Sequence, residues 1–311
     1  MKVYVVGAGA IGTYLGDVLS ATGAEVSYAP RRLEDVVEVA PDLALVAVKS
    51  YDTPGAVSAL ERALAHSPET TILTVQNGVG NEEFFARAFG ADRVEAGALT
   101  VPVERTAGGG VRAAQPGGIG LAPVGQTPHN WLVAAFEKAG LPVVVCDDYR
   151  ALKWSKLALN IVANAGCAIL DMLPAEMMRD PALFALELAA VRETSAVMEG
   201  LALRAVDLPR YPVRTFLATA ALPVPVARAI LAGRFAKSRG TKVPSLLLDL
   251  RAGRRTEVGA LNGAVAAAGA RLSLATPVNA AFARIVEEIG ANPARWATYR
   301  RRPASLIAAT R

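Results

Sequence analysis

Lysine and carboxylate side chains have to carry any proton transfer in this chain, because histidine is nearly absent. The 311 residues include two histidines, His66 and His129, and both lie in turn-like segments. A Ser-His-Asp triad, a histidine acid for hydride transfer and a histidine-rich metal site are therefore poorly supported. The sequence predicts no metal site.

The segment 154–164 holds the densest set of polar groups that could do chemistry. Lys156, Asn160 and Asn164 are spaced four residues apart, so on one helix they would form a polar stripe. The residues between them are apolar, which predicts a buried helix whose stripe faces a polar cavity or internal partners. Two interpretations stay open here: a catalytic lysine, or a structural Lys–Glu pair beside two satisfied asparagines.

The N-terminus has the pattern of a phosphate-binding turn. An apolar run at residues 2–6 leads into G-x-G-x-x-G at residues 7–12, where the expected cofactor-binding residues are Gly7, Gly9, Ala10, Ile11 and Gly12. Gly7 allows a tight turn, Gly9 lets a pyrophosphate approach the backbone, and Gly12 lets helix and strand pack closely. A helix at 10–22 and a strand at 25–28 complete the context. We expect dinucleotide binding through the helix N-terminus, with a non-binding turn as the alternative.

The end of the second predicted strand indicates which dinucleotide binds. A carboxylate about 20 residues past the glycines would hold the ribose hydroxyls of NAD, whereas an arginine accommodates the 2′-phosphate of NADP. The chain has Arg31 and Arg32 here, and its first acid is Glu34. Two guanidinium groups favour NADPH/NADP+, because each offers a planar fork of donors to a phosphate. A solvated basic loop is the alternative.

Two more polar residues follow predicted strands of the first half. Lys49 comes after the strand at 43–48, and Asn77 after the strand at 71–75. In open α/β sheets ligands bind at the carboxyl ends of the strands, so both residues are expected at the ligand edge. An exposed lysine and a turn asparagine are the plainer interpretations.

The elements that position these residues fall into two groups. Short β-rich runs alternate with helical stretches in the first half, a pattern typical of a parallel, doubly wound sheet. The predicted strands lie at 2–7, 25–28, 43–48, 71–75, 94–101, 119–123 and 142–146, with a hairpin-like addition near 111–114. From Tyr149 onward the sequence is rich in alanine and leucine with helical periodicity. We therefore predict an α/β fold: a Rossmann-type NADP-binding domain at 1–147 and an all-α substrate and catalytic domain at 148–311.

Composition narrows the class of protein. The net charge of +5 suits small anionic ligands, and the chain has no basic stripe with interleaved aromatics, so we expect no nucleic-acid binding. No apolar run is long enough to predict a membrane span. Two cysteines, Cys146 and Cys167, fit a reducing cytoplasm. Long Ala/Leu helices could pack a homodimer, but a buried core and an interface look alike in sequence.

Five motifs together carry a resemblance to a known family. They are G-x-G-x-x-G at 7–12, V-K-S-Y at 48–51, Q-N-G-x-G at 76–80, W-x-K-L-x-x-N-x-x-x-N at 154–164 and P-S-x-x-x-D-x-x-x-G-R-x-T-E at 244–257. In this order, they make the chain resemble the ketopantoate reductase (2-dehydropantoate 2-reductase) family over nearly its whole length.

The resemblance implies a reaction and a role for each residue. NADPH would reduce the small anionic 2-oxoacid ketopantoate to pantoate, on the route to pantothenate and coenzyme A. Lys156 would be the general acid and Glu257 its carboxylate partner, since an ammonium can stabilise and protonate the alkoxide that hydride transfer leaves. Substrate contacts would come from Asn160, Asn164 and Ser245, with Lys49 and Asn77 near both nicotinamide and substrate.

The chain departs from the family pattern at several places. Only residues 33–42 separate Arg32 from the third predicted strand, where family members usually carry several tens more that hold a helix and an extra strand. This change bears on the NADP contacts and the strand count. Gln115 replaces a common histidine, Leu246 a frequent methionine, and Val258-Gly259 a more polar pair, all of which bear on the substrate.

Three hypotheses follow. The first is a ketopantoate reductase, the second a related reductase for another 2-oxoacid, and the third a non-catalytic NADP(H)-binding sensor. Lys156, Asn160, Asn164 and Glu257 together argue against the sensor, because a sensor needs no such proton-handling group.

Overall fold

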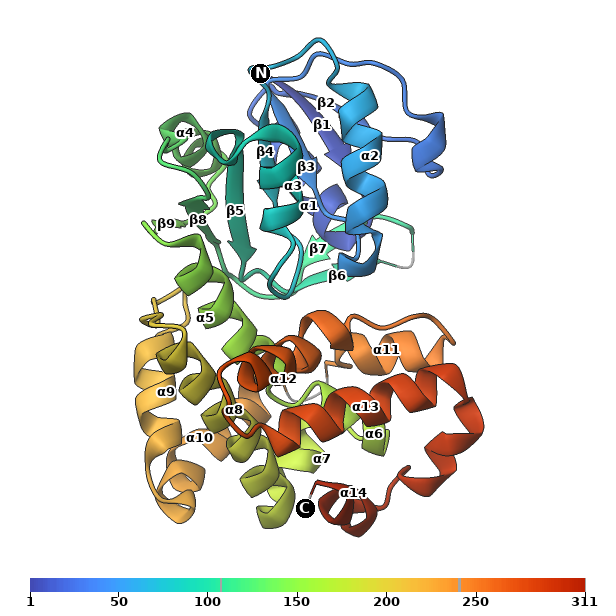
Figure 1. The fold of residues 1–311 in the computed structure, drawn as a ribbon, viewed down its shortest axis with the longest axis vertical. Coiled ribbons are helices and arrows are strands. Elements are labelled where there is room, and N and C mark those ends of the chain that lie inside the picture. Colours follow the sequence, from blue (N-terminus) through green and yellow to red (C-terminus); the bar gives the residue numbers. More distant parts are fainter. Residues whose placement is uncertain (107, 240–241, 311) are drawn as a thin grey trace. The chain divides into compact units, whose positions relative to one another are not determined.

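The chain forms two compact units (Figure 1). The computed structural model describes residues 1–106, 108–239 and 242–310. Residues 1–155 and 206–212 make the first unit, and residues 156–205 with the chain from Val213 onward make the second. The division therefore falls inside helix α5 (Tyr149–Ile161) rather than at the predicted position after residue 147.

The first unit contains a seven-stranded sheet with the order β2-β1-β3-β4-β5-β8-β9. Its strands are β1 (Lys2–Val6), β2 (Glu25–Tyr28), β3 (Leu43–Val46), β4 (Thr71–Thr74), β5 (Val94–Leu99), β8 (Ile119–Pro123) and β9 (Val143–Val145). Every predicted strand is confirmed, and the Rossmann-type fold class is confirmed with it.

One pair of strands differs from the predicted parallel sheet. Strands β5 and β8 are antiparallel, whereas the other neighbouring strands are parallel. The connection between them is the hairpin of β6 (Val103–Arg105) and β7 (Val111–Ala113) instead of a crossover helix. A hairpin reverses the chain direction, whereas a parallel return needs a long crossover.

Helices cover both faces of this sheet, because successive residues of a strand point to opposite sides. Val3 and Val5 face α1 (Ala10–Ser20) and α4 (Asn130–Lys138) in one core. Tyr4 and Val6 face α2 (Thr53–Ala63) and α3 (Glu82–Phe89) in the other. Figure 1 shows α2 and α3 side by side over the sheet. This double layer explains why the central strands β1, β3 and β4 are buried along nearly their whole length.

The short segment 33–42 packs as an extended cover. It contains one turn of 3₁₀ helix, η1 (Leu33–Asp35), and adds no strand to the sheet. Val36 is buried in the α2 core, and Leu33 and Val39 pack against the same core. A few apolar side chains thus close the face that a longer connection would otherwise cover.

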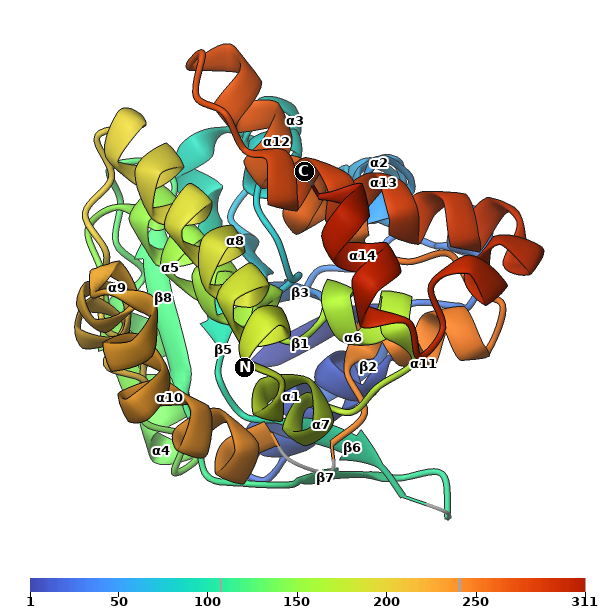
Figure 2. The same cartoon turned by 90° about the horizontal axis from the view of Figure 1, so that it is seen from below.

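The second unit is helical, as predicted. Its helices are α6 (Ala165–Leu170), α7 (Pro174–Arg179), α8 (Pro181–Gly200), α9 (Val213–Ala221), α10 (Val224–Arg239), α11 (Ser245–Arg251), α12 (Asn262–Arg271), α13 (Pro277–Ala291) and α14 (Pro303–Ala309). The long helix α8 packs against α7, α9, α10, α12, α13 and α14 (Figure 2). Helices α7, α8, α13 and α14 all begin with proline, which suits the first helical position.

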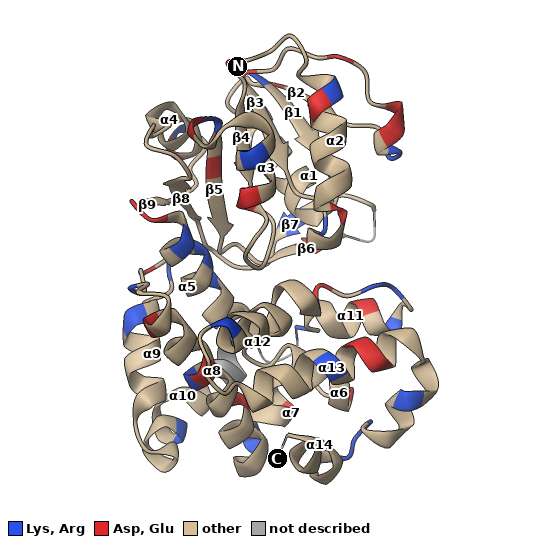
Figure 3. Ribbon diagram, viewed as in Figure 1, with Lys and Arg blue, Asp and Glu red and all other residues tan. Residues whose placement is uncertain are grey.

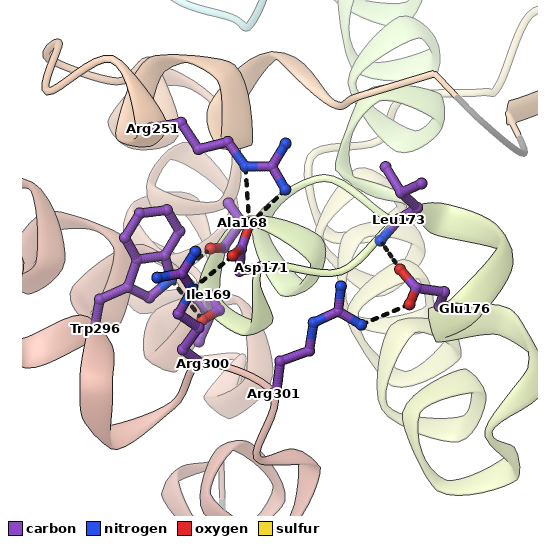
Figure 4. Close-up of polar contacts among 9 residues, drawn as sticks. All are labelled: Ala168, Ile169, Asp171, Leu173, Glu176, Arg251, Trp296, Arg300 and Arg301. Carbon is purple, nitrogen blue, oxygen red and sulfur yellow. Dashed lines mark hydrogen bonds and ion pairs between the residues drawn. The ribbon is translucent and has the colours of Figure 1, made fainter.

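The C-terminal segment is fastened to the end of α6 (Figure 4). Trp296 Nε1, in the 3₁₀ helix η5 (Pro293–Thr298), donates to the carbonyl oxygens of Ala168 at 3.1 Å and Ile169 at 2.9 Å. The backbone N–H of Arg301 donates to Leu170 O at 2.8 Å. The last carbonyls of α6, which have no partner inside the helix, are thereby satisfied.

Asp171 forms the charged part of the same attachment. It follows α6 with φ of 51° and is 5 % exposed. Its Oδ1 accepts from Arg251 Nη2 at 2.6 Å, and its Oδ2 accepts from Arg300 Nε at 2.6 Å. Burial alone would raise the pKa of Asp171, but the hydrogen bonds from both arginines outweigh it and hold that pKa below its ordinary value.

Charged residues are spread over the helices of both units (Figure 3). In the part of the chain that the structure describes, no helix is both long and apolar enough to span a bilayer.

Candidate functional site

The glycine-rich loop has the shape that a dinucleotide requires. Gly7 adopts φ of +107°, and a Cβ at Gly12 would lie 2.1 Å from Gly7 O, so both glycines are needed for the fold. A Cβ at Gly9 would meet no atom within 4 Å among the described residues. Gly9 caps α1, whose first N–H groups have no carbonyl partner inside the helix. Open space before a helix N-terminus fits a pyrophosphate.

An arginine that the sequence did not single out also contacts this loop. Arg105, at the end of β6, donates from Nη2 to the carbonyl oxygen of Ala8 at 2.9 Å. Nearly a hundred residues separate the two, so no local pattern could have revealed the contact. It places a guanidinium beside the loop between Gly7 and Gly9.

Arg31 and Arg32 follow β2 as the sequence placed them, and both are exposed. Arg32 Nη1 lies 3.9 Å from Glu34 Oε1, with both side chains about three-quarters exposed. Such an exposed pair is weak, so it would compete little with a phosphate for the guanidinium.

Lys49 and Asn77 lie at the carboxyl ends of β3 and β4, as predicted from the strand pattern. Lys49 is half-buried directly before the 3₁₀ helix η2 (Ser50–Asp52). Asn77 is half-buried in a loop whose glycines, Gly78 and Gly80, have φ of 85° and 89°. Its carbonyl oxygen accepts from Asn81 Nδ2 at 3.3 Å.

The polar stripe of the second motif is interrupted, which corrects the sequence prediction. Lys156 and Asn160 lie on α5, half-buried, but the helix ends at Ile161, and Asn164 is the N-cap of the next helix, α6. Ala163 adopts φ of 51°, and its N–H donates to the buried Glu187 Oε2 at 2.7 Å. That left-handed residue turns the chain away from the α5 axis.

Asn164 instead joins two motifs of the second unit. Its Nδ2 donates to Asn160 O at 3.1 Å, and its Oδ1 accepts from the N–H of Leu246 at 3.3 Å. Leu246 follows Ser245, which is the exposed first residue of α11. The end of α5 and the start of α11 are therefore held together by one amide side chain.

Two acids of the last motif are buried. Glu257 is 7 % exposed and directly precedes the 3₁₀ helix η4 (Val258–Ala260). Asp249 is 4 % exposed, and its Oδ1 accepts from Arg254 Nε at 3.0 Å. Val258 and Leu246, the apolar departures from the family pattern, are both 1 % exposed.

A buried Lys–Glu pair does occur on α5, at a lysine that the sequence interpretation passed over. Lys153 Nζ lies 2.9 Å from Glu82 Oε1, and both side chains are almost fully buried. Near it, Tyr149 OH donates to Glu83 Oε1 at 3.2 Å. Burial, with the negative charge of Glu83, raises the pKa of Tyr149 to about 12. The sequence signal that could have revealed this pair is a lysine placed between Leu152 and Trp154 in a helix with many apolar residues.

Comparisons with known proteins agree with the motifs. The family model described as "Ketopantoate reductase PanE/ApbA" matches residues 27–126, and its C-terminal counterpart matches residues 148–290. A 2-dehydropantoate 2-reductase of Caulobacter vibrioides is 30 % identical over 258 residues, covering 82 % of this chain and 80 % of that one.

Solved structures give the same result for the fold. The PanE/ApbA family ketopantoate reductase of Ralstonia eutropha JMP134 has a TM-score of 0.76 and 26 % identity, covering 94 % of this chain and 99 % of that one. A D-mandelate dehydrogenase solved with NADH also has a TM-score of 0.76 at 20 % identity, with the same coverage of both chains. At that identity the likeness concerns the fold.

Proposed function

Because the chain belongs to the ketopantoate reductase family and is an oxidoreductase of that kind, we propose that it reduces ketopantoate to pantoate with NADPH. The product would feed the synthesis of pantothenate and coenzyme A. The proposal includes a cytoplasmic location, in keeping with Cys146 and Cys167, which are buried and not joined in a disulfide. The proposal also includes a homodimer.

One observation carries this proposal most directly. Asn164 binds Asn160 O and the N–H of Leu246, so the helix with Lys156 and the helix that begins at Ser245 are joined. The family resemblance assigns Asn160, Asn164 and Ser245 to substrate binding. Asn160 and Ser245 would then orient the carboxylate and hydroxyl groups of a 2-oxoacid.

Lys156 is the proposed general acid. When bound, the dinucleotide supplies a hydride to the ketone carbon. The Lys156 ammonium would stabilise the negative charge that develops on the ketone oxygen and then protonate it, which completes the alcohol. The buried carboxylate of Glu257 would favour the charged form of Lys156, because an opposite charge stabilises an ammonium.

NADPH is proposed over NADH because of the residues after β2. Arg31 and Arg32 take the place where an NAD site carries an acid, and both are exposed. Gly7, Gly9 and Gly12 would hold the pyrophosphate, with the N–H groups of Ala10 and Ile11 directed at it. Lys49 and Asn77 would lie near the nicotinamide.

A related reductase for another 2-oxoacid is the second candidate. Val258 and Leu246 are apolar and buried next to Glu257 and Ser245, respectively. A less polar lining would suit a substrate with fewer hydroxyl groups. The sensor hypothesis is disfavoured, because the curated relatives are named as reductases.

The deciding experiment measures NADPH oxidation by the purified protein with ketopantoate and with a panel of other 2-oxoacids. Preferred turnover of ketopantoate supports the first candidate. A better panel member reassigns the substrate and keeps the mechanism. Binding of NADPH without turnover of any 2-oxoacid would contradict both candidates.

A further inference from the structure

Lys153 is a buried lysine whose ammonium group has an acceptor for each of its three protons. Its residue is 2 % exposed, and its Nζ lies 2.9 Å from Glu82 Oε1, 2.6 Å from Gln76 O and 3.3 Å from Gly97 O. An ammonium has three protons to donate, and here it meets three acceptors. Removing such a charge from water is costly, so this lysine needs a specific set of partners.

The three acceptors belong to three different elements at one end of the sheet. Gln76 follows β4, Gly97 lies in β5, and Glu82 begins α3. Thr74, the last residue of β4, donates from Oγ1 to Glu82 Oε1 at 2.7 Å. Helix α5 is therefore fixed to the end of β4 through one side chain.

The loop that carries Asn77 is restrained on both sides. Lys153 holds the carbonyl of Gln76 before it, and Asn81 Nδ2 holds the carbonyl of Asn77 itself. The two restraints are connected through Thr53, whose Oγ1 accepts from Gln76 Nε2 at 2.8 Å and donates to Asn81 Oδ1 at 3.0 Å. These residues are all buried apart from Asn77.

The same lysine stands one helical turn before Lys156. Residues three apart on a helix are neighbours, so an anchor at Lys153 limits the freedom of the turn that bears Lys156. The hydrogen bond from Tyr149 to Glu83 adds a second attachment to α3 four residues earlier. Helix α5 runs without a break from Tyr149 to Ile161.

We propose that Lys153 is a positioning residue, which fixes the Asn77 loop and the helical turn before Lys156 through its bonds to Gln76, Gly97 and Glu82. This inference rests on the proposed function, because it takes Asn77 and Lys156 as members of the reductase site. Lys153 itself touches neither substrate nor cofactor in this account.

The double variant Lys153→Met/Glu82→Gln separates positioning from stability. It removes both buried charges together, and replacing a buried ion pair with neutral groups often leaves stability unchanged. The matched control is Lys138→Met, which removes an exposed lysine of the same unit whose Nζ contacts Thr22 O at 3.2 Å. We expect the control to keep the melting temperature of the wild type. The double variant should fold but melt a few degrees lower, because the carbonyl oxygens of Gln76 and Gly97 lose a donor.

The kinetic result distinguishes the two roles. With Lys153 as a positioning residue, the double variant has kcat lowered about tenfold to a hundredfold, because small misplacements of reacting groups slow the chemical step. The isotope effect on kcat with NADPH deuterated at the transferred position should rise, and NADPH affinity should stay at the wild-type value. If Lys153 only stabilises the fold, a smaller fraction of the double variant is active, and its isotope effect equals that of the wild type.

Hydrogen exchange tests the anchor without any turnover. Peptides covering residues 75–83 and 149–156 should exchange faster in the double variant, whereas a peptide covering residues 2–12 should not. If the wild type reduces no 2-oxoacid, the proposed function fails while this measurement still reports on the anchor. Unchanged exchange would overturn the inference, as would wild-type kcat with a wild-type isotope effect in the folded variant.

If the double variant fails to fold, the single variant Glu82→Gln provides the test. Glu82→Gln keeps the shape of the site and the bonds from Lys153 to Gln76 and Gly97. We expect faster exchange and a larger isotope effect, both smaller than in the double variant. A folded Glu82→Gln protein identical to the wild type in both measurements, beside an unfolded double variant, would assign the pair to stability alone.

Discussion

Gly9 and Gly12 lie three residues apart, but alanine should affect a different property at each: NADPH binding at Gly9 and stability at Gly12. Gly9 has φ of −76°, and its Cβ would meet no atom of the described chain, so Gly9→Ala should fold normally. Its methyl group would lie where we place the pyrophosphate, and NADPH affinity should fall about tenfold or more. Gly12→Ala would clash with Gly7 O and should cost about 2–3 kcal/mol of stability. Thermal melts and fluorescence titrations with NADPH would check both, and normal NADPH binding by a folded Gly9→Ala protein would contradict this assignment.

Lys156 is the residue on which the proposed chemistry depends most. Lys156→Ala should leave the fold intact, because the residue is half-buried, and should lower kcat about 10²–10⁴-fold, the usual contribution of a general acid. Circular dichroism and steady-state NADPH oxidation measure the two effects. Activity within about tenfold of the wild type would rule out this residue as the acid.

In the proposed function, Arg31 decides the choice between the two nicotinamide dinucleotides. Arg31→Ala should weaken NADPH binding about tenfold and leave NADH binding nearly unchanged, because only NADPH carries a 2′-phosphate for a charged hydrogen bond. Titrations of both dinucleotides give the comparison. Equal losses would mean that the 2′-phosphate is bound elsewhere, and the short segment after Arg32 would then be the place to search.

The attachment of the C-terminal segment makes stability depend on pH through Asp171. The pKa of this carboxyl is lowered in the folded state, so its stabilisation is present above the unfolded pKa and is lost as the pH falls below about 4. Asp171→Asn should cost about 1–2 kcal/mol at neutral pH, because its arginine partners are about half-exposed, and should flatten the acid limb of the stability curve.

Glu288→Gln provides the matched control for Asp171. It removes an ion pair with Arg284 on the exposed side of α13 and should change stability by less than about 0.5 kcal/mol. Denaturant titrations at several pH values measure both variants. An Asp171→Asn protein with the acid limb of the wild type would show that another group dominates it.

The elements that could be predicted from sequence are those whose signals are local. Residues 7–12 specify a turn and helix start within six positions, and apolar runs such as 43–46 specify buried strands. The break before Asn164 was missed because periodicity does not register the left-handed Ala163 or its bond to Glu187, 24 positions later. The antiparallel β8 depends on a hairpin whose pairing is likewise not local.

The ion pair of Lys153 shows the same limit for the site. Glu82 lies 71 positions earlier in the chain, on another element. The sequence analysis weighed a Lys–Glu pair at Lys156 and did not consider one at Lys153. Which lysine of a helix faces the sheet depends on how the helix is packed, and spacing within the helix does not contain that information.

The molecule as a whole should unfold as one system despite its two units. Residues 206–212 belong to the first unit, yet they are connected on both sides to helices of the second. Thr100 Oγ1 donates to Pro209 O at 3.0 Å, and Val206 N donates to Ser155 Oγ at 2.9 Å. Unfolding of the first unit therefore releases a segment whose two ends continue directly into the chain of the second unit. Calorimetry should show a single transition, and two well-separated transitions would contradict this coupling.

The excursion at residues 206–212 also sets an order of events during protein synthesis. When the ribosome has made the first 155 residues, the first unit still lacks the strip that packs beside Gly118, where a side chain at that position would collide with Pro209. That strip leaves the exit tunnel only after helix α8 has been made. The nucleotide-binding half of the chain thus has to wait, incomplete, for part of its neighbour to be translated.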